Sequence, residues 1–139
     1  MALTQSEGQV CCLDWQRILR LLDWDVKVLV VPAHEIEGDR ARVYRRTPNK
    51  RHGVIRITDP AELEPQSDDA DWEVSLVHEL LHFHLWEMTD ALRGLAEAIG
   101  PVFGPVVDVA QKHHEEAEER AVYHLAYALV NLKRGYAKG

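Results

Sequence analysis

The chain of 139 residues has few of the features that mark secreted or membrane proteins. Its two cysteines are Cys11 and Cys12, and neighbouring cysteines rarely bridge, so neither a disulfide scaffold nor a cysteine-rich zinc site is expected. That usage favours a reducing compartment. Residues 1–7 lack the basic start and apolar run of a signal peptide, and no apolar run is long enough to span a bilayer. We therefore expect a soluble, cytoplasmic protein without membrane contact.

An excess of positive charge is also missing, because the formal net charge is −7. Proteins that bind nucleic acid usually carry a basic domain, so this balance argues against such a partner. The charges are unevenly spread: residues 40–56 hold seven basic and no acidic side chains, and residues 59–73 hold seven acidic and no basic ones. We interpret the basic stretch as a strand surface that faces the acidic loop. The alternative is DNA contact through Arg45, Arg46 and Arg51.

The composition, with 46% hydrophobic and 28% charged residues, is that of one globular domain covering residues 1–139. Periodicity and turn residues predict a first helix that Asp14 caps, then three strands, then three helices. This order predicts an α+β fold in which a small antiparallel sheet is followed by helices. The helices are expected at residues 14–22, 71–88, 90–99 and 106–134, and the strands at residues 24–31, 40–46 and 53–58.

The helix expected at residues 71–88 contains the motif His-Glu-x-x-His, formed by His78, Glu79 and His82. Residues four apart lie on the same helix face, so both imidazoles project in one direction and can bind one zinc ion. Glu79 lies about 100° further round the helix. Its carboxylate is therefore placed to take a proton from a metal-bound water, which makes Glu79 the candidate general base.

Two histidines do not complete a zinc site, so a third protein ligand is expected. The last predicted helix offers acidic and imidazole side chains in residues 113–119. On a helical projection, Glu118 lies near the centre of the apolar stripe, where an unpaired carboxylate would be costly and a metal would remove that cost. His114 and Glu115 lie on or beside the same face and remain alternatives. Glu116 and Glu119 point further toward solvent.

The two segments together resemble the minimal gluzincin pattern, as in ImmA/IrrE-type metallopeptidases and small phage-type metallopeptidases. In those families a glutamate on the second helix is followed three residues later by an alanine, as Glu118 and Ala121 are here. The resemblance implies a zincin-like fold and a zinc-dependent hydrolase that cleaves peptide bonds in a protein or peptide substrate. It implies His78, His82 and Glu118 as metal ligands for Zn2+.

The resemblance also implies that an edge strand beside the cleft binds the substrate backbone by strand addition. The strand Val54–Thr58 is our candidate for that edge. Two other functions remain open. The chain could be a catalytically silent zincin-like scaffold that regulates or binds, or a SprT-like DNA-associated protease that uses the basic stretch at residues 40–56.

Overall fold

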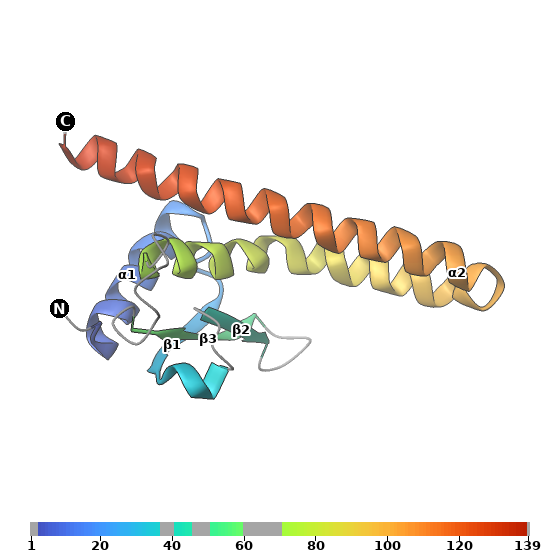
Figure 1. Cartoon of the computed structure of the whole chain (residues 1–139), viewed down its shortest axis with the longest axis horizontal. Helices are drawn as coiled ribbons and strands as arrows, with labels where there is room; N and C mark the ends of the chain where they lie inside the picture. Colours follow the sequence, from blue (N-terminus) through green and yellow to red (C-terminus); the bar gives the residue numbers. More distant parts are fainter. Residues whose placement is uncertain (1–2, 37–40, 46–50, 60–70, 139) are drawn as a thin grey trace.

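The computed structural model describes residues 3–36, 41–45, 51–59 and 71–138. Its elements follow the chain as a helix, a strand, a short 3-10 helix, two strands and a long helical segment (Figure 1). Their bounds are α1 (Gln5–Ile18), β1 (Asp25–Val31), η1 (Ala33–Ile36), β2 (Ala41–Arg45), β3 (His52–Thr58) and α2 (Trp72–Lys138). The predicted α+β class and the three predicted strands are confirmed. The predicted acidic loop, residues 61–70, lies outside the described part of the chain.

Helix α1 begins earlier than predicted, because a capping box precedes it. The Thr4 side chain accepts a hydrogen bond from the Glu7 N–H (3.1 Å), and the Glu7 carboxylate accepts one from the Thr4 N–H (3.0 Å). These two bonds satisfy N–H groups that the first turn would otherwise leave open. The prediction that Asp14 caps this helix is therefore wrong, since Asp14 lies inside α1.

The three strands form a mixed sheet in the order β1-β3-β2. Strand β3 pairs with β2 in antiparallel and with β1 in parallel orientation, so the prediction of an antiparallel sheet is wrong for the β1–β3 pair. Ile55 and Ile57 of β3 are fully buried, and their alternation with less buried neighbours matches the pattern read from the sequence. Strand β3 is thus the central strand of the sheet, and its buried side chains share one core with those of α2.

The side of β1 away from β3 is occupied by two glutamine side chains from α1. Gln9 donates to the Val26 carbonyl (3.1 Å) and accepts from the Val28 N–H (2.9 Å). Gln5 makes the equivalent pair, donating to the Val28 carbonyl and accepting from the Val30 N–H (2.9 Å). Each primary amide offers one donor and one acceptor side by side, so it satisfies strand backbone groups as a neighbouring strand would.

Helix α2 turns back on itself, so that its two ends lie together. A straight helix of its 67 residues would be about 100 Å long. Yet Glu73 Oε1 lies 2.9 Å from Lys133 Nζ, and Arg134 also contacts Asp71 and Glu73. Figure 1 shows the chain running out along one arm, reversing, and returning antiparallel. We call residues 72–99 the first arm and residues 104–138 the second arm.

The predicted boundary between helices at 71–88 and 90–99 does not exist, because the first arm is helical through Thr89. The reversal lies near residues 100–105, where glycines and prolines predicted a break (Figure 1). Within the described residues, no helix is both long and apolar enough to cross a membrane.

The arms pack through one buried face each. On the first arm Val77, Leu80 and Phe83 are buried against the sheet and α1, and on the second arm Val122, Ala126 and Val130 join the same core. Burying one such aliphatic or aromatic side chain contributes about 1.5–3 kcal/mol. Core packing therefore holds the first four turns of the first arm in place, and the His-Glu-x-x-His motif lies in these turns.

Candidate metal centre

The first arm holds the two motif histidines one turn apart on a face that looks toward the second arm. Asp71 caps the helix, because its carboxylate accepts from the Glu73 N–H (3.1 Å) and the Val74 N–H (3.4 Å). The rings of His78 and His82 lie with their centroids 5.2 Å apart, and both side chains are largely buried. The predicted juxtaposition of the two imidazoles is present in the structure.

Glu119 of the second arm lies opposite both imidazoles. Its Oε2 is 3.2 Å from His78 Nε2, and its Oε1 is 2.9 Å from His82 Nε2. One ligand atom from each of His78, His82 and Glu119 lies within 4.8 Å of the other two, a spacing that can hold a metal ion. Two imidazoles and one carboxylate, with a further position for water, are the donor set of a catalytic zinc site.

Glu118 contacts the other nitrogen of His82. Its Oε1 lies 3.1 Å from His82 Nδ1, and its Oε2 accepts a hydrogen bond from Thr89 Oγ1 (3.3 Å) and lies 3.3 Å from His114 Nε2. Carboxylates thus face both nitrogens of the His82 ring, and a metal bound at Nε2 would leave Nδ1–H to donate to Glu118. Glu118 thus holds the His82 ring so that its Nε2 is directed at Glu119.

The two neighbouring glutamates differ in environment as well as in partners. The Glu118 side chain is 10% exposed, whereas that of Glu119 is 59% exposed. The sequence therefore identified the buried carboxylate correctly, but the group of three possible ligand atoms contains Glu119 instead. Glu118 as a metal ligand stays a prediction. Glu119 was missed because a projection shows only where a Cβ points, and a long side chain at the border of a buried face can reach across to the facing arm.

Burial acts on the protonation of the first histidine. Desolvation lowers the pKa of His78 below its ordinary value of 6.5, and the neighbouring His82 acts in the same direction. The Glu119 carboxylate opposes the shift but does not cancel it. A neutral imidazole is the form that binds metals, so this environment favours a ligand role for His78.

The remaining predicted site residues lie close to this centre. Glu79 follows His78 on the first arm and is partly buried, and its role as general base stays a prediction. Of the two alternatives for the third ligand, His114 contacts Glu118, while Glu115 is exposed and lines the neighbouring cleft. Neither belongs to the group of three possible ligand atoms found in the described residues.

The thiols are not suited to metal binding. Burial raises the pKa of Cys11 and of Cys12 to about 12, so both remain protonated near neutral pH. Protonated thiols are neither metal ligands nor nucleophiles. The candidate centre consequently depends on imidazole and carboxylate groups.

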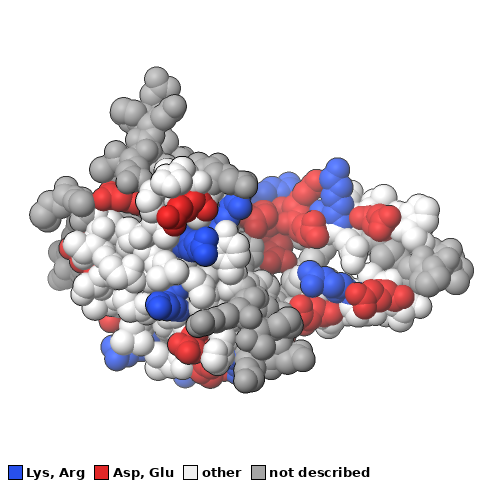
Figure 2. Space-filling model, turned by 90° about the horizontal axis from the view of Figure 1, so that it is seen from below, with Lys and Arg blue, Asp and Glu red and all other residues white. Residues whose placement is uncertain are grey.

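A cleft opens beside Glu118 and Glu119. It has a volume of about 460 Å³, and a second hollow of about 560 Å³ adjoins it at Glu115 and Glu119. Figure 2 shows acidic side chains gathered where the arms leave the sheet-containing part of the molecule. The cleft is lined by Trp86, Thr89, Asp90, Arg93, Glu115, Glu118 and Glu119. The cleft therefore opens Glu119, one of the three candidate ligands, to solvent.

The strand predicted to bind substrate does not lie at the edge of the sheet. Strand β3 is central, so the assignment of Val54–Thr58 as an edge is wrong. The antiparallel edge strand of the described sheet is β2.

Two arginines of the basic stretch are already engaged. Arg51 pairs with Asp23 and Glu87, and the Arg56 guanidinium lies over the Tyr44 ring at 5.1 Å. Arg46, a candidate for DNA contact in the alternative function, lies outside the described residues.

Comparison of the chain with protein-family models, with curated proteins and with solved structures gives no match. The assignment of the centre consequently depends on its geometry and on the motif.

Proposed function

We propose that the protein is a zinc-dependent hydrolase that cleaves peptide bonds, with the metal held by His78, His82 and Glu119. The observation that carries the proposal is the convergence of these three ligand atoms, from two arms of one helical segment, within 4.8 Å. The set of two histidines and one glutamate matches the ligand set of catalytic zinc sites. The motif that supplies two of the three also supplies a carboxylate at the position of a general base.

Each residue has a defined task in this proposal. A bound zinc ion would polarise the substrate carbonyl and lower the pKa of a water at its open position. Glu79 would accept the proton of that water and deliver it to the departing amine. Glu118, which contacts His82 Nδ1 at 3.1 Å, keeps the imidazole in the ligating tautomer. Glu118 thereby takes a positioning role in place of the ligand role that the sequence predicted.

Metal content of the purified chain tests the first half of the proposal. We expect one zinc per chain in the wild type and in Glu79→Gln, and little zinc in His78→Ala. His124→Ala is a matched control, because His124 is exposed on the second arm and makes no described contact with the three candidate ligands. Equal zinc content in His78→Ala and wild type would contradict the assigned centre.

Turnover tests the second half. A mixture of blocked peptides is incubated with each variant, and new termini are identified by mass spectrometry. We expect cleavage by the wild type and by His124→Ala, and loss of cleavage with a chelator or with Glu79→Gln. Zinc binding without any cleavage that distinguishes Glu79→Gln from wild type would instead favour the catalytically silent scaffold.

A further inference from the structure

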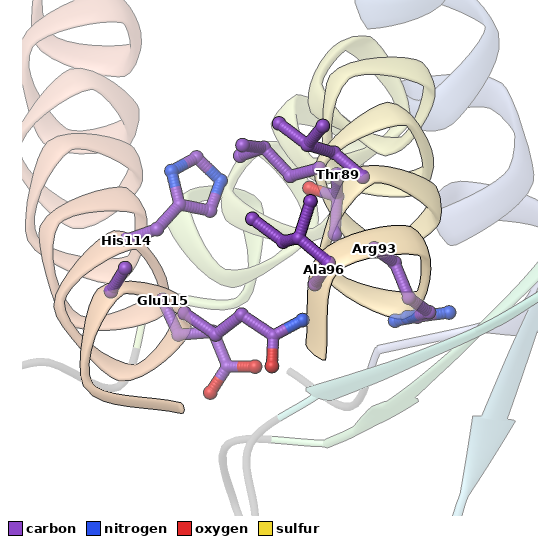
Figure 3. Close-up of a pocket in the computed structure, with 10 residues that line it drawn as sticks. Thr89, Arg93, Ala96, His114 and Glu115 are labelled. Atoms are coloured by element: carbon purple, nitrogen blue, oxygen red, sulfur yellow. The ribbon is translucent and has the colours of Figure 1, made fainter. Parts of the chain in front are cut away.

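A second pocket lies between the two arms, further toward their reversal than the metal centre. In Figure 3 Thr89 and Ala96 of the first arm lie opposite His114 of the second, and the Arg93 guanidinium points away from the second arm. The pocket has a volume of about 140 Å³. Its lining includes Thr89, Leu92, Leu95 and Ile99 of the first arm and Ala110 and His114 of the second.

The walls of this pocket are mostly apolar. Leu92, Leu95 and Ile99 contribute to it and are each more than one third exposed to solvent. An engineered apolar cavity of similar size, about 150 Å³, binds benzene. The volume therefore suits one aliphatic or phenyl side chain. Thr89 and His114 supply the few polar groups that typically orient a ligand in an apolar site.

The pocket adjoins the cleft that lies beside the candidate metal centre. Thr89 and His114 line it, and both approach the same Glu118 oxygen at 3.3 Å. The cleft beside Glu119 shares Thr89, Arg93 and Glu115 with the pocket. The pocket and the cleft beside Glu119 are therefore neighbouring hollows with a common wall.

We propose that this pocket receives one apolar side chain, between leucine and phenylalanine in size, of a peptide substrate whose adjacent backbone lies at the metal centre. The inference rests on the proposed function and names its substrate class. The shared wall of the pocket and the cleft favours a peptide over a second copy of the chain, because an extended peptide can place one side chain in the pocket and its backbone in the polar cleft. The pocket thus selects a substrate residue close to the bond that is cleaved.

Binding can be measured without turnover, by titrating the 15N-labelled full chain with acetyl-Gly-Gly-Leu-Gly-Gly-amide and with the same peptide carrying serine in place of leucine. We expect the leucine peptide to shift signals of pocket residues and to bind about tenfold or more tightly than the serine peptide, from the transfer free energy of a leucine side chain. Ala110→Phe, which fills the pocket, and Leu92→Asn, which makes its wall polar, should each abolish this preference. Ala128→Phe, at an exposed position of the second arm outside the pocket, should preserve it.

The results separate this inference from the proposed function. Equal affinity for the two peptides, absence of binding, or an unchanged preference in both pocket variants with native circular dichroism would overturn the pocket assignment even if zinc-dependent cleavage were observed. Signal shifts that depend on protein concentration alone would overturn it in favour of self-association. Selective leucine binding by a protein that takes up no zinc would retain the pocket and overturn the proposed metal centre.

Discussion

Glu118 and Glu119 are neighbours in sequence, yet the structure gives them different surroundings. Consecutive residues on a helix point about 100° apart, so one carboxylate enters the space between the arms and the other lies at its border. Glu118 reaches His82 Nδ1, Thr89 and His114, and Glu119 reaches the Nε2 atoms of both motif histidines. A ligand and the group that orients another ligand can thus come from two successive positions.

Amide substitutions separate these two tasks. Glu119→Gln is expected to weaken zinc binding severely, because it removes a charged ligand. Glu118→Gln is expected to lower zinc affinity by about 10–100-fold and still bind one zinc at saturation, as for other groups that orient a metal-bound histidine. Competition with a chromophoric chelator measures both affinities, and Glu116→Gln serves as the exposed control. The reverse order of effects would make Glu118 the third ligand.

Gly53 is a position where the sheet and the first arm approach closely. A Cβ at this residue would lie 2.2 and 2.3 Å from two ring atoms of Phe83, which is itself buried. We expect Gly53→Ala to lower the free energy of unfolding by about 1–3 kcal/mol, the usual cost of overpacking a core. Denaturant unfolding provides the measurement.

Gly94 offers the matched control for that substitution. It lies in the first arm, and nothing comes within 4 Å of the position a Cβ would take. Gly94→Ala should stabilise the protein by about 0.4–1 kcal/mol, because alanine loses less backbone entropy in a helix. Equal effects of the two substitutions would show that the contact between Gly53 and Phe83 is relaxed at little cost.

For single residues, the sequence predicted that His78 and His82 lie on one helix face and that Glu118 is buried. These predictions need only the helical period, which is local. The contact of Glu119 with both histidines could not be predicted. It depends on how two segments about 40 residues apart along the chain face one another. Neighbouring acidic residues of which one is buried are the signal that would have directed attention to it.

At the scale of elements, ion pairs join the start of the first arm to the end of the second. Lys133 lies 2.9 Å from Glu73, which Arg134 also contacts at 3.1 Å, and Arg134 forms a further pair with Asp71. Burial favours the neutral acids, but these cations outweigh it, so the pKa of each carboxyl lies below its ordinary value, 3.8 for Asp71 and 4.5 for Glu73. The ends of the hairpin are thus held by groups that must remain charged.

These depressed pKa values predict how stability depends on pH. The carboxylates contribute fully above their ordinary values, and the contribution is lost as the pH falls through the folded values. Arg134→Leu should therefore lower the thermal unfolding temperature near pH 7 and reduce its decline between about pH 5 and pH 3. Arg17→Leu, which removes an exposed pair with Asp14, should leave that decline unchanged. A wild-type decline in Arg134→Leu would contradict the role of the pairs.

The extents of the strands were predictable, because alternation and turn residues are local features. Their arrangement was not: β3 lies between two strands that both precede it in sequence, and the parallel β1–β3 pair has no signature in either strand alone. The start of α1 is a different case, since the capping box at Thr4 and Glu7 was present in the sequence and was overlooked in favour of the stronger apolar period after Asp14.

At the scale of the whole molecule, the proposed centre connects the two arms, so metal binding should stabilise the fold. A ligand that binds only the folded state adds about 2.7 kcal/mol when present at 100 times its dissociation constant. Adding zinc to chelator-treated protein should therefore raise the thermal unfolding temperature by several degrees. The same addition should change little in His82→Ala. Identical shifts in the two proteins would point to zinc binding elsewhere.

The sequence could not predict how α2 reverses, and the assembly of the site depends on that reversal. Gly and Pro residues at 100–105 indicated a break, but a break does not specify the direction in which the next helix runs. The contacts between residues 71–73 and 133–134 settle that direction, and with it the approach of Glu118 and Glu119 to the histidines. Such contacts between distant segments are a property of the packed chain.

Gln5 and Gln9 have a further consequence for the behaviour of the protein in concentrated solution. Growth of a fibril by strand pairing requires two unoccupied margins on every copy, so that each molecule can be both template and addition. The two amides occupy the margin at β1, which leaves β2 as the other edge strand among the described residues. Strand pairing through β2 alone would join two molecules and could not continue further. The two glutamines would therefore prevent growth beyond a dimer.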